Sequence, residues 1–157
     1  MLAAPVQGCG AALLIDEHPE IVAQIGADGT HVRDARTLSP ALALLKPERI
    51  VGAGELASRD DAMRAGEAGA DYVMFGEPDH AGQRPSFQAI IERVAWWTEL
   101  FVVPCVAYAA SLEEVDPLCA AGAEFIAVED LVWSDPRGPR AAVRDLTSRL
   151  SVTETAE

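Results

Sequence analysis

The chain has 157 residues, of which 50% are hydrophobic and 24% charged, and this composition excludes an intrinsically disordered protein. Its formal net charge is −13, so a nucleic-acid backbone or an anionic bilayer would repel it, and we expect neither as a partner. No stretch reaches the roughly 18 apolar residues of a membrane span. The N-terminal residues also lack the basic and apolar regions of a signal peptide.

The cysteines favour a reducing compartment. Cys9, Cys105 and Cys119 are odd in number and form no Cys-x-x-Cys pair. We therefore expect free thiols in a cytoplasmic protein, with packing rather than catalysis or metal binding as their role.

The predicted strands are continuous apolar runs, which are typical of strands buried on both faces of a parallel sheet. In chain order they lie near residues 11–15, 29–32, 49–53, 71–76, 102–108 and 124–129. Helical stretches separate them, and the last helix is expected over residues 139–150. Residues 1–150 are thus expected to form one α/β domain, with a polar tail over residues 151–157.

A Gly-Ala-acid step recurs three times, at Gly26-Ala27-Asp28, Gly69-Ala70-Asp71 and Gly122-Ala123-Glu124. Each step follows a helical stretch and precedes a strand-like run. Glycine takes the left-handed conformation that ends many helices without a steric penalty. Each step therefore predicts the end of a helix, a short loop and the start of a strand.

Helix starts carry capping signals. Ser39 followed by Pro40 predicts an N-cap with proline in the first turn, and Ser111 with Glu114 fits a capping box. Ser58 with Asp61 is a weaker version of the same pattern.

Alternating strands and helices leave two architectures, an open doubly wound sheet or a (β/α)8 barrel. No Gly-x-Gly-x-x-Gly or P-loop follows any predicted strand, so the nucleotide-binding form of the open sheet loses its main support. Six βα units are too few for a closed eight-stranded barrel.

Five segments are spread over residues 11–133: Gly26 to His31, Ile50 to Gly52, Gly69 to Gly76, Pro104 to Ala107 and Ala121 to Val128. In this order they resemble strands four to eight of the thiamine phosphate synthase and thiazole tautomerase family. The resemblance implies a partial (β/α)8 barrel of about six parallel strands with helices outside. The family's first two βα units, including a Gln-x-Arg-x-Lys element that contacts pyrophosphate, have no counterpart in the sequence.

A fragment, a late reading frame or a covering partner would each account for this difference. Two unpaired strand edges beside an apolar interior favour association, so we expect a homo-oligomer.

The family joins a pyrimidine diphosphate to a thiazole phosphate in thiamine biosynthesis. The resemblance therefore implies small phosphorylated substrates and Mg²⁺, which with cationic groups stabilises the departing pyrophosphate. Backbone amides at the carboxyl ends of the strands would hold the phosphate.

The resemblance also implies metal ligands. The family's Asn-Asp pair after its third strand falls on Asp16 and Glu17, which makes Asp16 a candidate substrate ligand and Glu17 a candidate magnesium ligand. The family's second metal carboxylate aligns with Arg36, and nearby Asp34 is the candidate substitute. The alternative is that Asp16 and Glu17 only cap the helix that follows.

The phosphate-binding positions differ from the family pattern. Its Thr-x-Thr-Lys segment becomes residues 81–84, where Arg84 is the candidate cation and a solvated loop residue is the alternative. Its Gly-Gly pair becomes Ala109 and Ala110, and its last serine becomes Asp130, preceded by Glu129. Carboxylates at these positions would repel a phosphate, so we expect a degenerate phosphate site.

Glu77 lies where the tautomerase branch of the family carries an acid-base histidine. A partly desolvated carboxylate there can have a raised pKa and move a proton. Pairing with Arg84 or His80 is the alternative reading. For His31, a packed and hydrogen-bonded ring is favoured over a ligand.

Three hypotheses follow: a thiamine phosphate synthase, a tautomerase-like or non-catalytic relative that binds a small ligand, and a barrel fragment whose role is association.

Overall fold

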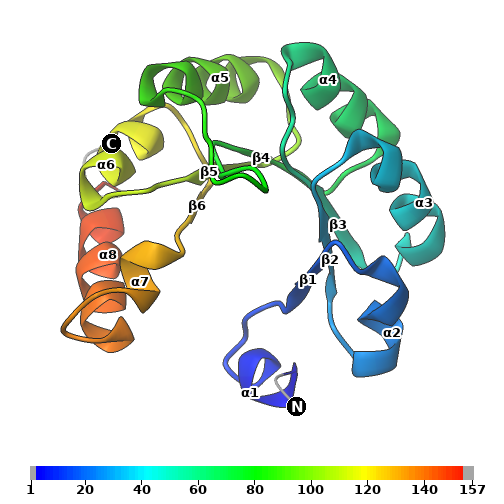
Figure 1. Cartoon of the computed structure of the whole chain (residues 1–157), viewed down its shortest axis with the longest axis horizontal. Coiled ribbons are helices and arrows are strands. Elements are labelled where there is room, and N and C mark those ends of the chain that lie inside the picture. The colour runs from blue at the N-terminus through cyan, green and yellow to red at the C-terminus, as the bar shows by residue number, and fades with distance from the viewer. Residues whose placement is uncertain (1–2, 154–157) are drawn as a thin grey trace. The chain divides into compact units, whose positions relative to one another are not determined.

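The computed structural model describes residues 3–153 and divides the chain into two compact units, Met1–Met74 and Phe75–Glu157. Both units contain parallel strands that alternate with helices (Figure 1).

The first unit holds the strands β1 (Leu14–Asp16), β2 (Gly29–Val32) and β3 (Ile50–Ala53), and most of β4 (Tyr72–Phe75). They pair in parallel in chain order. Its helical segments are α1 (Ala3–Gln7), a 3-10 turn (Pro19–Ile21), α2 (Val22–Ile25), α3 (Ala35–Leu45) and α4 (Arg59–Ala68).

The strand register of the first unit places four residues in one row. Asp16 pairs with His31, His31 with Gly52, and Gly52 with Tyr72. Residues paired in parallel strands point to the same face of the sheet, so this row lies on one face.

The second unit holds β5 (Cys105–Tyr108) and β6 (Phe125–Ala127), which pair in parallel with Val106 opposite Phe125. Its helices are α5 (Phe87–Leu100), α6 (Leu112–Ala120), α7 (Asp130–Trp133) and α8 (Pro139–Thr153).

Trp97 on α5 anchors the core of the second unit. Its ring is fully buried, stacks on Phe101 with centroids 4.2 Å apart and meets Phe75 edge-on at 6.0 Å. Its indole N–H donates to the carbonyl of Val103 at 2.7 Å, which satisfies the only polar atom of the side chain.

All six predicted strands lie where the sequence places them, but five are shorter than expected. The largest difference is in the fifth, where residues 102–104 are not strand and Val102 is almost fully exposed. Pro104 cannot donate to a strand ladder, and the Val103 carbonyl already accepts from Trp97. At the other end, α8 continues to Thr153, past the predicted Leu150, and residues 154–157 of the expected tail lie outside the described part.

The Gly-Ala-acid steps end helices as predicted. Gly26, Gly69 and Gly122 have φ angles of 71°, 100° and 97°. A side chain at these positions would be strained because L-residues rarely adopt this conformation.

The acid of each step has a structural role that the sequence did not predict. We call Asp28, Asp71 and Glu124 the strand-start carboxylates. Each accepts a hydrogen bond from one backbone N–H near the start of the strand that comes before it in the chain. The distances are 2.7 Å from Leu13 to Asp28, 2.7 Å from Val51 to Asp71 and 2.8 Å from Cys105 to Glu124.

The backbone N–H of each strand-start carboxylate donates to the carbonyl of the same partner, at 2.8, 2.8 and 3.2 Å. Each acid thus closes a two-bond ring between neighbouring strands. These rings lie at the amino ends of the strands and leave the carboxyl ends for a site.

One predicted helix cap is wrong, and a second has the predicted N-cap residue but lacks its side-chain hydrogen bond. Helix α3 begins at Ala35, and its N-cap is Asp34, whose Oδ1 accepts from Arg36 N at 2.8 Å, so Ser39 and Pro40 lie inside the helix. Ser111 precedes α6 but its side chain makes no capping hydrogen bond. The weaker signal, Ser58 with Asp61, forms a complete capping box.

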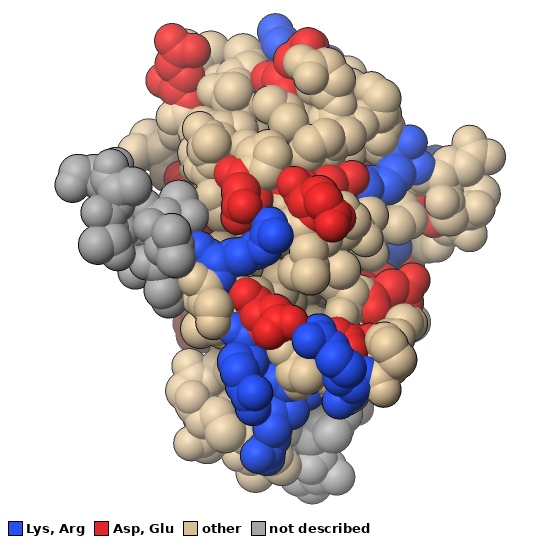
Figure 2. Space-filling view, turned by 90° about the vertical axis from the view of Figure 1, so that its left-hand side faces the viewer, with Lys and Arg blue, Asp and Glu red and all other residues tan. Residues whose placement is uncertain are grey.

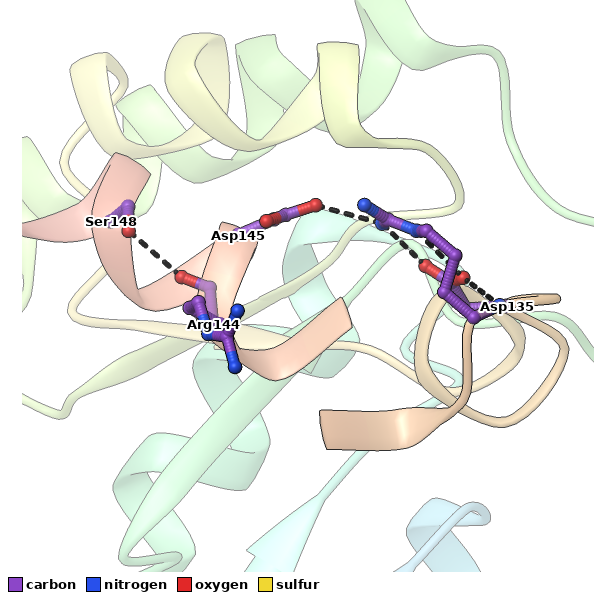
Figure 3. Close-up of polar contacts among 5 residues, drawn as sticks. Asp135, Arg144, Asp145 and Ser148 are labelled. Carbon is purple, nitrogen blue, oxygen red and sulfur yellow. Dashed lines mark hydrogen bonds and ion pairs between the residues drawn. The ribbon is translucent and has the colours of Figure 1, made fainter. Parts of the chain in front are cut away.

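Charged side chains of the second unit are paired across its surface (Figure 2). Arg137 joins Asp135 and Asp145 at 2.8 Å each. Figure 3 labels Asp135 and Asp145 and draws their contacts as dashed lines. Arg149 pairs with Asp116 at 2.9 Å.

None of the helices described has the length and apolar character needed to cross a bilayer.

Candidate functional site

The carboxyl ends of the strands in the first unit are tied together by Arg33. Its guanidinium contacts Asp16 through two hydrogen-bonding atoms, with Nη2 2.9 Å from Oδ2 and Nε 3.1 Å from Oδ1. A third atom, Nη1, lies 3.4 Å from Oε1 of Glu55. Because Asp16 ends β1, Arg33 follows β2 and Glu55 follows β3, one cation links three strand ends.

Beneath this cation, His31 and Tyr72 meet over Gly52. His31 Nδ1 lies 2.9 Å from the Tyr72 hydroxyl, and the rings stack with centroids 5.7 Å apart. A Cβ on Gly52 would come within 1.9 Å of Tyr72 Cζ, so the ring position requires glycine there. The packed, hydrogen-bonded histidine favoured by the sequence is what the structure contains.

Burial lowers the pKa of His31 to about 4, and the nearby Asp16 carboxylate only partly opposes this. The ring is therefore neutral at pH 7. Its Nε2 atom is buried and has no hydrogen-bond partner among the described residues. An unsatisfied buried nitrogen costs free energy unless a ligand or water pairs with it.

The predicted magnesium ligands, Glu17 and Asp34, follow β1 and β2. Glu17 has φ 56° and its N–H donates to the carbonyl of His31 at 2.8 Å. Asp34 caps α3 and accepts from Arg36 Nε at 3.0 Å. Within residues 3–153, no three His, Cys, Asp or Glu side chains are grouped as a metal site requires. Magnesium and its ligands Glu17 and Asp34 stay a prediction.

In the second unit, Arg84 crosses the carboxyl ends of β4 and β5. Its Nε donates to the Gly76 carbonyl at 3.0 Å and its Nη2 to the Tyr108 carbonyl at 3.1 Å. Its Nη1 lies 3.0 Å from both oxygens of Glu114. The side chain is only 20% exposed, so Arg84 is not a solvated loop residue.

Glu114 was missed as a site residue. Its Oε2 accepts the backbone N–H of Ala110 at 2.8 Å in addition to its contacts with Arg84. The sequence signal was present, because a glutamate at the third position of a helix often turns back toward the helix start. Its partner Arg84 lies 30 residues away, and no local pattern connects the two.

The other predicted phosphate positions differ in their surroundings. Ala109 is buried and its N–H donates to the Ala127 carbonyl at 2.9 Å, so it belongs to the pairing of β5 with β6. Asp130 begins α7 and lines a pocket of about 230 Å³ together with Asp135.

Tyr108 feels the carboxylates of Glu129 and Asp130, and Arg84 Cζ lies 5.6 Å from the centre of its ring. Burial raises the pKa of Tyr108, and the carboxylates of Glu129 and Asp130 raise it further. The phenol is therefore a proton donor at neutral pH, next to two negative charges.

Glu77, the predicted proton shuttle, follows Gly76 at the carboxyl end of β4 and is only 7% exposed. Gly76 has φ 92°, and a Cβ there would lie 2.9 Å from Ile90 Cδ1. The backbone thus turns sharply just before Glu77. The placement is that expected of a site residue, while the proton-transfer role stays a prediction.

The sequence matches one protein family over most of its length. The profile of the family described as thiamine monophosphate synthase matches residues 1–131. The chain belongs to the thiamine monophosphate synthase family. The resemblance seen in the sequence is thereby confirmed.

Relatives with the same name agree with the family. The chain is 40% identical over 144 residues to the thiamine-phosphate synthase of Hyphomonas neptunium, covering 90% of this chain and 65% of the relative. It is 42% identical over 143 residues to that of Rhodospirillum centenum, covering 89% of this chain and 69% of the relative. The chain thus spans about two thirds of the length of the relatives it matches.

Solved structures confirm the fold. The thiamine phosphate pyrophosphorylase of Pyrococcus furiosus superposes with a TM-score of 0.80 at 21% identity, covering 97% of this chain and 73% of that structure. A 3-hexulose-6-phosphate synthase superposes with a TM-score of 0.65 at 20% identity, covering 83% and 66%. The fold is α/β with parallel strands of the TIM-barrel type, as predicted.

Proposed function

We propose that the chain acts in thiamine biosynthesis as a thiamine phosphate synthase, joining a pyrimidine diphosphate to a thiazole phosphate. The observation that carries this proposal is the 40% identity over 144 residues to a protein named thiamine-phosphate synthase. The placement of Arg33, Arg84 and Glu77 at the carboxyl ends of strands supports it, because barrel enzymes carry their sites there.

In the proposed reaction a bond forms between the thiazole nitrogen and the pyrimidine methylene carbon, and the bond from that carbon to the diphosphate oxygen breaks. Pyrophosphate leaves with the bonding electrons, so positive charge near the leaving group lowers the barrier. In the first unit, Arg33 is a cation at a strand end that can supply this charge. Mg²⁺ is proposed as cofactor on the family resemblance alone, with Glu17 as its candidate ligand.

A degenerate phosphate site is part of the proposal. Arg84 shares its carboxyl end of the second unit with the acidic residues Glu77, Glu114, Glu129 and Asp130. This excess of negative charge opposes a bound phosphate at short range. We therefore propose small phosphorylated substrates as ligands, held more weakly than in a site rich in cations.

Thiazole tautomerisation is the second candidate, and the burial of Glu77 favours it. A desolvated carboxylate at a strand end is suited to moving a proton.

Self-association remains a proposal as well. It is supported by Phe125, which is 60% exposed on β6.

Pyrophosphate release tests the synthase proposal. Purified chain, Mg²⁺ and both phosphorylated substrates should release pyrophosphate in proportion to protein, and Arg33→Gln should reduce the rate about tenfold or more. Glu67→Gln, on the exposed face of α4, is the matched control and should leave the rate unchanged. If the unaltered chain releases no pyrophosphate, the synthase proposal fails.

The same preparation tests the alternative. Glu77→Gln should abolish any thiazole tautomerisation, because a neutral amide cannot exchange the proton. Tautomerisation that persists in Glu77→Gln would exclude this residue as the proton shuttle.

A further inference from the structure

The carboxyl end of β5 contains a small group of hydrogen-bond donors suited to an anion. They are the Nη1 of Arg84 and the backbone N–H of Ala110, which we call the anion cradle. Charged forks and backbone amides of this kind bind carboxylates and phosphates alike.

The anion cradle already holds an anion. Both oxygens of Glu114 lie 3.0 Å from Nη1 of Arg84, and Oε2 also accepts from Ala110 at 2.8 Å. Glu114 is 16% exposed and Arg84 20%, so the pair is largely shielded from solvent. Shielding strengthens the attraction between the two charges relative to a surface pair.

The position of Glu114 on α6 shows that its orientation is not the ordinary local one. It is the third residue of the helix, from which a glutamate commonly reaches back to the N-cap. Here the Ser111 side chain makes no capping bond to the helix, and Glu114 reaches past Ser111 to Ala110 and Arg84. The carboxylate of Glu114 thus forms its hydrogen bonds at the carboxyl end of β5, not with the N-cap of its own helix.

We propose that Glu114 is a specificity-determining residue, an internal carboxylate that fills the anion cradle and excludes phosphate from it. A phosphate placed on the same donors would lie within contact distance of Glu114, and two anions at that distance repel strongly in a shielded site. Removing the charge of Glu114 while keeping its shape should therefore open the anion cradle to phosphate.

The proposal is independent of whether the chain joins two substrates. It concerns binding of an oxyanion by Arg84 and Ala110, and its test needs neither the pyrimidine nor the thiazole. Failure to release pyrophosphate would leave it standing, and failure of phosphate binding would leave the synthase proposal open.

Calorimetric titration of the full chain with inorganic phosphate gives the test. Glu114→Gln should bind phosphate at least about tenfold more tightly than the unaltered chain, because a competing charged hydrogen bond is lost. Glu113→Gln is the matched control: it removes one exposed charge from the same helix turn, so it should change the affinity little. The double variant Glu114→Gln with Arg84→Gln should lose the gain.

A second measurement uses the unaltered chain, so it does not depend on the folding of a variant. The backbone amide signal of Ala110 should not move over the range of phosphate concentrations used in the calorimetric titration. A shift of that signal in the unaltered chain at the same concentrations would overturn the proposal. Equal phosphate affinity of the unaltered chain and Glu114→Gln would overturn it as well, and Glu114 would then only brace Arg84.

Discussion

His31 is a buried residue that packs in the core of the first unit and still has one ring nitrogen, Nε2, without a hydrogen-bond partner among the described residues. The ring stacks on Tyr72, and Gly52 leaves the space in which the tyrosine lies. The unpartnered Nε2 is a donor or acceptor that a ligand on this face of the first unit can use. A neutral ring suits that task, because burial holds the pKa at about 4.

The pKa of His31 predicts how the free energy of unfolding depends on pH. In the unfolded chain this residue binds a proton below about pH 6.5, whereas in the folded protein it stays neutral down to about pH 4. Between these values the unfolded state binds more protons, so stability falls as the pH is lowered. The contribution lost is up to about 3 kcal/mol, from a shift of this size.

Urea unfolding from pH 4.5 to 7 measures this contribution. His31→Gln, which cannot titrate, should flatten the decline, while His18→Gln at an exposed site should not. An equally steep decline in His31→Gln would show that His31 is not its source.

At the scale of the elements, the strand-start carboxylates explain why a Gly-Ala-acid step recurs. The glycine ends the helix and the acid fixes the start of a strand against its neighbour. Asp71 carries an additional ion pair to Lys46. Because the same geometry occurs in both units, these acids contribute to the fold rather than to the site.

Asp71→Asn should lower the free energy of unfolding by about 1–2 kcal/mol, since it weakens a charge-assisted hydrogen bond to Val51 and removes the ion pair. Asp60→Asn is the matched control. It breaks an exposed pair with Arg64 on α4 and should cost less than about 0.5 kcal/mol. Chemical denaturation compares the two, and equal losses would contradict a special role for the strand-start carboxylate.

Local signals predicted the elements well but not their side-chain partners. Glycine conformation and apolar runs depend on neighbouring residues, so the helix ends and strand positions could be read from the sequence. The pairing of Arg84 with Glu114 depends on how β4, α5 and α6 come together. Helix α3 begins after Asp34 and not after Ser39, because the Asp34 carboxylate accepts a hydrogen bond from Arg36 N. The Ser39-Pro40 pattern therefore did not mark the start of this helix.

At the scale of the whole molecule, family membership and the direction of the strands both indicate a site at the carboxyl ends of the strands. In both units the amino ends of strands are closed by carboxylates bound to backbone amides. The candidate site residues Asp16, Arg33, Glu77 and Arg84 all lie at carboxyl ends. The central claim is that the carboxyl ends of β1, β2 and β3 in the first unit bind the phosphorylated substrate.

Titration with the pyrimidine diphosphate and Mg²⁺, followed through backbone amide signals, tests this claim most directly. The amides of Glu17 and Gly54, which follow strands of the first unit, should shift with increasing ligand. Those of Leu13, Val51 and Cys105, which are bonded to the strand-start carboxylates, should stay in place. Shifts confined to the strand starts, or no shifts at either end, would contradict the account.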